Sequence, residues 1–164
     1  MSTIIVGIDP GLDGGLSTLI KSDDGRIVHI KSEPMPTIGG AKGKRMISLA
    51  GVKNFLLEAN PHIVIMERVG AMPGQGVSSM WNFGHGVGVI EGIVFTLGLQ
   101  TMFVLPQAWQ KVVLKGLPKD MEKPSQLFCQ RTFPNVDWRA SERCRTPHDG
   151  KTDACCLAYF YALS

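Results

Sequence analysis

The chain has 164 residues, a length that predicts one domain, residues 1–164, with a core that needs no cross-links. Hydrophobic residues make up 44% and charged residues 19%, and the net charge of +3 permits a polyanionic partner without requiring one. Asp9 interrupts the first apolar stretch, and His85 and Glu91 interrupt the longest one, so the sequence predicts neither a leader nor a membrane span. These features favour a cytoplasmic protein without a membrane partner.

The first predicted element is a strand that runs from Ile4 to Asp9 and is stopped by Pro10 and Gly11. Its unbroken apolar character is typical of a strand that is buried on both faces. A carboxylate at the end of such a strand is costly unless it is paired or binds a cation, which makes Asp9 a candidate site residue. The alternative is that Asp-Pro-Gly is only a turn signal.

Two further strands are expected at residues 14–20 and 26–31, joined by the turn Ser22-Asp23-Asp24-Gly25 in an antiparallel meander. Residues 34–44 are rich in Pro, Gly and Lys, which favours a surface loop. Apolar residues then recur at helical spacing and predict a helix over residues 46–59, ended by Asn60-Pro61.

A second apolar run closes on an acid at residues 62–67. Because a helical crossover precedes it, this strand is expected to lie parallel to the first one. Adjacent strands are about 4.8 Å apart, so Glu67 would then lie alongside Asp9. An ion pair with Arg68 is the alternative role for Glu67.

The following elements are a loop over residues 70–76, a helix that Ser78 or Ser79 caps and that runs to about residue 97, and a strand over residues 100–105. Gly84, Gly88 and Gly92 share one stripe of that helix, which indicates close approach of another backbone, either the sheet or a second subunit. A short helix from residue 107, a helix over 122–132 and a loop over 135–147 come next.

The last element is a helix that begins near His148 and Asp149. Asp149 and Asp153 are four residues apart, so they share one helix face and repel each other unless a positive group lies close by. The alternative is that Asp149 is an N-cap and Asp153 a surface residue that the helix dipole favours.

Four carboxylates, those of Asp9, Glu67, Asp149 and Asp153, would form a pocket of hard oxygen ligands. Such ligands favour Mg²⁺, for which Mn²⁺ can substitute, and two ions about 3.5–4 Å apart can support an in-line displacement at phosphorus. The expected reaction is phosphodiester hydrolysis. His148 or Lys151 could orient the nucleophile or stabilise charge.

Three short motifs resemble the RuvC-type Holliday junction resolvases of the RNase H-like superfamily. They are Ile8-Asp9-Pro10-Gly11, Ile65-Met66-Glu67 and the run from His148 to Ala154. A closer resemblance to the phage and prophage branch is carried by Glu67-Arg68-Val69 with Met72-Pro73-Gly74-Gln75-Gly76, by Phe83-Gly84 and by Pro106-Gln107-Ala108-Trp109.

The resemblance implies an α/β fold with a five-stranded mixed sheet, its first three strands antiparallel and the others parallel, with helices on both faces. It also implies a homodimer that makes paired Mg²⁺-dependent nicks in a four-way DNA junction and leaves 5′-phosphates. The loop with Gln75 would meet the junction near its crossover, and Lys115, Lys119 and Lys123 would lie along the DNA arms.

One position departs from the housekeeping pattern of this family, in which the last two acids are three residues apart. The residue three before Asp153 is Gly150. Either Asp149 supplies the ligand from one position earlier, or His148 takes part.

Two other functions stay open at this point. The chain could be a nuclease of the same fold that acts on a flap, another branched DNA or an RNA–DNA hybrid, or a non-catalytic DNA-binding module. An actin-like ATPase is excluded because it needs two such domains.

Overall fold

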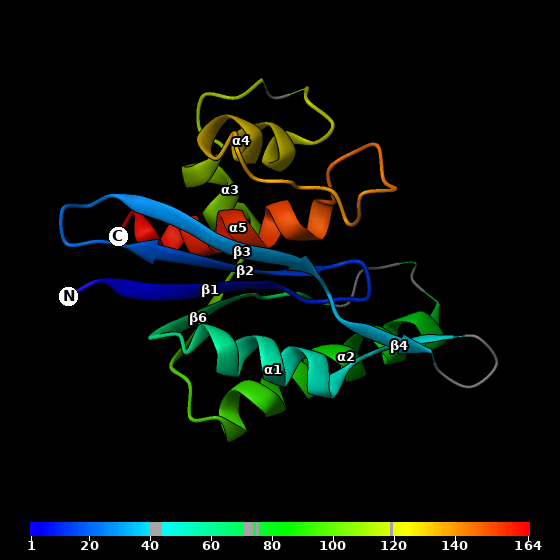
Figure 1. The fold of residues 1–164 in the computed structure, drawn as a ribbon. Coiled ribbons are helices and arrows are strands. Elements are labelled where there is room, and N and C mark those ends of the chain that lie inside the picture. The colour runs from blue at the N-terminus through cyan, green and yellow to red at the C-terminus, as the bar shows by residue number, and fades with distance from the viewer. Residues whose placement is uncertain (40–43, 71–73, 75, 119) are drawn as a thin grey trace.

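The centre of the molecule is a five-stranded sheet, seen in a computed structural model that describes residues 1–39, 44–70, 74, 76–118 and 120–164 (Figure 1). Its strands lie in the order β3-β2-β1-β6-β7. They are β1 (Thr3–Asp9), β2 (Gly15–Lys21), β3 (Ile27–Pro34), β6 (Ile63–Glu67) and β7 (Thr101–Val104). β1, β2 and β3 pair antiparallel, whereas β6 runs parallel to β1 and β7 parallel to β6. The predicted mixed sheet is confirmed.

The register of β1 places both predicted acids at one edge of the sheet. β1 pairs with β6 through Ile8 and Met66, so Asp9 and Glu67 each follow the last residues of this ladder. On the other side Asp9 pairs with Gly15 of β2. The connecting turn is tight because Gly11 has φ +133°, a conformation that L side chains rarely adopt.

The segment before the first helix differs from the sequence prediction. β4 (Thr37–Gly39) and β5 (Arg45–Ile47) form a separate two-stranded antiparallel sheet. β4 lies where a loop was predicted, and β5 takes up the predicted start of the helix. Residues 40–43 lie outside the described residues. The helix consequently begins later, at α1 (Leu49–Ala59), where the hydroxyl of Ser48 accepts a hydrogen bond of 3.1 Å from the amide of Gly51.

Helices cover both faces of the sheet, as predicted (Figure 1). α1 and α2 (Val77–Thr96) lie on one face. α5 (Asp149–Ala162) packs on the other against β1 and β2, with α3 (Pro106–Val113) and α4 (Pro124–Thr132) against it. Within the described parts of the chain, no helix combines the length and apolar character needed to cross a bilayer.

Two helix starts also differ from the prediction. Gly76 occupies the N-cap position of α2, and Ser78 and Ser79 lie inside the helix. His148, rather than Asp149, is the N-cap of α5. Asp149 is therefore the first residue of that helix, where its charge is favoured by the helix dipole.

Side chains of β1 and β6 alternate between two cores, and this alternation decides where the acids point. Val6 and Ile8 of β1 belong to the core under α1 and α2, whereas Ile5 belongs to the core under α5. In β6, Val64 and Met66 belong to the core under α1 and α2, and Ile63 and Ile65 belong to the core under α5. By the two-residue period of a strand, Asp9 and Glu67 fall on the face that α5 covers.

Candidate metal-dependent active site

α5 lies directly on the strand that carries Asp9. A Cβ atom at Gly7 would come within 1.9 Å of the carbonyl oxygen of Ala154, so only glycine permits this approach. Gly7 points to the same side of β1 as Asp9, two residues on. Ala154 directly follows Asp153, and the close contact brings Asp153 within electrostatic reach of Asp9.

A second glycine contact fixes the start of α5. A Cβ at Gly150 would lie 2.1 Å from the carbonyl carbon of Gly14, in the turn between β1 and β2. No side chain can therefore occupy position 150 without moving that turn. In this packing the position three residues before Asp153 has no room for an acidic side chain, and the acid at the start of α5 is Asp149.

The predicted acids influence one another, which places them within electrostatic reach at one site. The pKa of Asp9 is raised well above its ordinary value, first by burial and then by the negative charges of Asp153, Glu67 and Asp149. Burial raises the pKa of Asp153 to about 6, with a further contribution from Glu67 and Asp149 that the hydroxyl of Ser125 opposes. Buried carboxylates that repel each other are suited to a bound cation.

Glu67 is anchored by a residue that the site prediction did not include. The indole Nε1–H of Trp109 donates to Oε1 of Glu67 over 2.8 Å. Burial raises the pKa of Glu67, and the bond from Trp109 opposes that rise. The alternative role proposed for Glu67, an ion pair with Arg68, is not found among the described residues.

Asp149 lies at the outer side of the site and is held by α4. The ammonium of Lys123 forms an ion pair with its Oδ2, and the side-chain amide of Gln126 donates to its Oδ1. The same amide donates over 3.2 Å to the carbonyl oxygen of Pro147. Both oxygens of Asp149 thus have partners within the protein.

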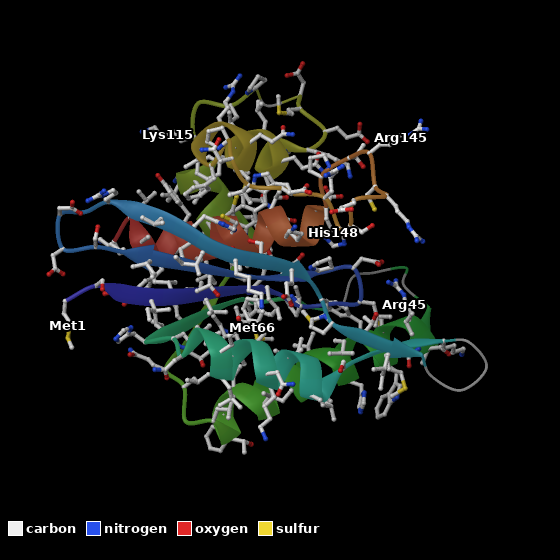
Figure 2. All side chains as sticks on the ribbon, viewed as in Figure 1. Met1, Arg45, Met66, Lys115, Arg145 and His148 are labelled. Carbon is white, nitrogen blue, oxygen red and sulfur yellow. The ribbon has the colours of Figure 1, made fainter. Side chains whose placement is uncertain are left out.

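The two candidate auxiliary residues belong to the start of α5. Figure 2 labels His148 there. Nδ1 of His148 accepts from the backbone amide of Lys151 over 3.4 Å, which is its N-cap contact. The pKa of His148 is lowered, chiefly by burial. Lys151 is buried, and its ammonium donates to the carbonyl oxygens of Asp137 and Arg139 over 2.7 and 2.8 Å. These bonds give Lys151 a structural role in the loop before α5.

The structure describes two of the four predicted nucleic-acid contacts, and these two lie apart from each other. Lys123 is at the site through its ion pair with Asp149. Lys115 is exposed beyond the end of α3, apart from His148 in Figure 2. Gln75 and Lys119 lie outside the described residues.

The side chains of the site have the chemistry that a divalent cation requires, but they lie too far apart to hold one without other ligands. Carboxylate oxygens are the ligands of Mg²⁺ and Mn²⁺. Within the described residues, however, no three His, Cys, Asp or Glu side chains are grouped closely enough to hold an ion by themselves. Mg²⁺ typically uses only one or two carboxylates together with waters and phosphate oxygens, so the charges and chemistry of the site suit this ion.

Sequence reasoning missed three residues that support the acids, namely Trp109, Ser125 and Gln126. Trp109 belongs to a segment already noted for its family resemblance, Pro106-Gln107-Ala108-Trp109. No signal in the sequence assigns it to Glu67, since the two residues are 42 positions apart. Ser125 and Gln126 are likewise distant in the sequence from the acids that they contact, Asp153 and Asp149.

Comparison with known proteins identifies the fold. No family model matches the sequence, and no curated protein matches it either. T. thermophilus RuvC in complex with a Holliday junction substrate superposes with TM-score 0.61 over 98% of this chain and 95% of that chain, at 14% identity.

Two further solved structures agree with this result. The yeast mitochondrial Holliday junction resolvase gives TM-score 0.62 over 96% of this chain and 77% of that chain, at 13% identity. The fowlpox virus resolvase with substrate Holliday junction DNA gives 0.55 over 98% and 97%, at 15% identity. The chain therefore has the fold of the RuvC-type Holliday junction resolvases, as its motifs predict.

Proposed function

We propose that the protein is a metal-dependent endonuclease that resolves four-way DNA junctions by paired nicks that leave 5′-phosphates. The observation that carries this proposal is the gathering of Asp9, Glu67, Asp149 and Asp153, from three distant elements, at one edge of the sheet. A DNA-binding module without catalysis has no need of buried carboxylates that repel one another. The fold shared with solved resolvases supports the choice of substrate.

The same acids, Asp9, Glu67, Asp149 and Asp153, would hold the metal, Mg²⁺ or Mn²⁺, with two ions in each site. The chemistry that such ions supply is a nucleophilic water at neutral pH and neutralisation of charge at the phosphate. Of these acids, Asp9 and Asp153 are the two whose pKa is raised both by burial and by the negative charges of the others. His148 stays a candidate for orienting the water, whereas Lys151 is held by loop carbonyls.

DNA binding is proposed to rest on basic residues around this edge. Lys123 already lies beside Asp149, so its ammonium can contact a phosphate that enters the site. Lys115, Lys119 and the loop residue Gln75 remain proposed contacts with the junction. Contacts to phosphate set affinity and its salt dependence without reading sequence. A role in DNA recombination accords with the cytoplasmic location predicted from the sequence.

A homodimer is proposed because α2 exposes an apolar face. Trp81 is 73% exposed and Phe95 86% exposed, and they lie on one stripe with the helix glycines. A Cβ at Gly84, Gly88 or Gly92 would meet no described atom within 4 Å, so the sheet of the same chain is not the close neighbour that these glycines predict. A second copy of α2 is the partner that fits. Two copies would supply the two sites that paired nicks require.

The test is cleavage of a synthetic four-way junction beside a linear duplex, a flap and an RNA–DNA hybrid, with Mg²⁺ or with a chelator. We expect the junction to be cut preferentially and only with the metal. Preference for the flap or the hybrid would establish a different nuclease, and absence of any cleavage would favour the binding module.

Asp9→Asn and Glu67→Gln should each abolish cleavage and leave junction binding intact, because removal of a negative charge does not weaken binding of an anion. Asp23→Asn is the matched control, since Asp23 lies exposed in the turn between β2 and β3. An Asp9→Asn protein that cuts at the wild-type rate would contradict the assignment.

A further inference from the structure

Trp109 is one of the largest fully buried side chains of the protein, and the only polar atom of this side chain forms a hydrogen bond at the candidate site. The side chain is 1% exposed and packs in the core under α5, with Ile65 and Cys155 in the same cluster. Its Nε1–H donates to Oε1 of Glu67 over 2.8 Å. An indole N–H is a donor only, so this bond suits an acceptor that carries negative charge.

Strand pairing explains how a residue so far along the chain reaches Glu67. Glu67 pairs with Val104, and the amide of Arg68 donates over 2.8 Å to the carbonyl oxygen of Val104. The chain then turns into α3, whose first residue is Pro106. The helix brings Trp109 back over the end of β6, and the packing of the indole fixes the direction of its N–H.

We propose that Trp109 is a positioning residue that holds the carboxylate of Glu67 ready to bind the divalent cation. This inference rests on the proposed function. With Oε1 held by the indole, the carboxylate cannot rotate freely, and its remaining lone pairs keep one orientation. Groups that orient a metal ligand from behind commonly change metal affinity or activity by about 10–100-fold when they are removed.

The chain contains a matched control for this role. Trp138 is also buried, at 3% exposed, but its Nε1 has no hydrogen-bond partner among the described residues. Trp109→Phe and Trp138→Phe therefore remove the same atoms from similarly buried sites. Only the first change removes a bond to a predicted metal ligand.

The experiment measures Mn²⁺ binding to the metal-free protein by calorimetry, together with junction cleavage as a function of Mg²⁺ concentration. For Trp109→Phe we expect Mn²⁺ affinity to fall by about 10-fold or more, with the cleavage rate partly recovered at high Mg²⁺. Trp138→Phe should bind Mn²⁺ with unchanged affinity. Unchanged Mn²⁺ affinity in Trp109→Phe, or an equal loss in both variants, would overturn the proposal.

A second measurement, which keeps Trp109 in place, covers the case in which Trp109→Phe fails to fold. In a spectrum of ¹⁵N-labelled indoles, the Trp109 signal should move on Mg²⁺ addition and in Glu67→Ala, while the Trp81 signal stays in place. If the Trp109 signal keeps the same chemical shift after Mg²⁺ addition and in Glu67→Ala, the proposal is wrong. Failure of the proposed function would instead appear as wild-type protein that neither binds Mn²⁺ nor cuts the junction.

Discussion

Burial of the Asp153 carboxylate lowers the stability of the folded protein at neutral pH. Its pKa is raised from 3.8 to about 6, first by burial, so the folded protein binds this proton more tightly than the unfolded chain does. As pH rises from about 4 to about 6, the unfolded state binds fewer protons, and the free energy of unfolding falls by up to roughly 3 kcal/mol. Above that range the loss is complete, and the proposed cation would offset it.

Asp153→Asn should therefore stabilise the metal-free protein at pH 7 while abolishing cleavage. We expect a gain of roughly 1–3 kcal/mol in the free energy of unfolding, because the amide carries no charge to desolvate or repel. Urea unfolding between pH 4 and pH 8 measures this, and the gain should shrink towards pH 4. The idea fails if Asp153→Asn is no more stable than wild type at pH 7, with Asp23→Asn as the surface control.

Individual residues also mark the limit of sequence-based prediction at the site. Asp9 and Glu67 could be predicted because each ends an apolar strand, and strand pairing alone brings them together. Asp149 and Asp153 could be predicted from their spacing on one helix. The contacts of Trp109 with Glu67 and of Gln126 with Asp149 could not, because they depend on how α3 and α4 pack.

At the scale of elements, the site depends on how closely α5 approaches the sheet. Gly7 faces Ala154, and Gly15 and Gly150 bring the start of α5 against the turn after β1. These contacts set the height of the helix above the strands. The proposed sharing of a cation by the carboxylates of Asp153 and Asp9 therefore depends on this close approach.

Gly7→Ala should therefore damage stability and activity together. The new methyl group would lie 1.9 Å from the carbonyl oxygen of Ala154, so α5 must move away from β1. We expect the free energy of unfolding to fall by about 1–3 kcal/mol, as for overpacked cores, and cleavage to fall at least 10-fold. Chemical denaturation and junction cleavage measure the two effects.

Gly39→Ala is the matched control for this change. Gly39 is also a strand residue, and a Cβ there would meet no described atom within 4 Å. If Gly7→Ala unfolds at the same denaturant concentration as wild type, α5 can move away from β1 without loss of stability, and the prediction is wrong.

The elements that sequence analysis predicted incorrectly share a physical reason. β4 and β5 have only 3 residues each, in a stretch rich in Gly and Lys, so neither has enough apolar alternation to indicate a strand. Their pairing satisfies the backbone and becomes visible only in three dimensions. The later start of α1 follows, because Met46 and Ile47 are used by β5.

In the molecule as a whole, contacts within one chain do not account for the glycine stripe and the exposed aromatic residues of α2. A helix with glycines on one stripe loses helix propensity, and a gain in packing must offset that loss. Its buried residues Ile90 and Val94 face the sheet, whereas Trp81 and Phe95 remain exposed. The proposed contact with a second subunit would supply that gain.

Gly88→Leu tests this contact, because it adds bulk where a Cβ would meet no described atom of the same chain within 4 Å. We expect the monomer to stay folded and the dimer to dissociate, as sedimentation velocity would show. On a plasmid that extrudes a cruciform, paired nicks that give linear DNA should change to single nicks that give open circles. Asn54→Leu, on the exposed side of α1, should change neither property. A Gly88→Leu protein that remains dimeric and still gives linear DNA would show that this face of α2 is not the subunit interface.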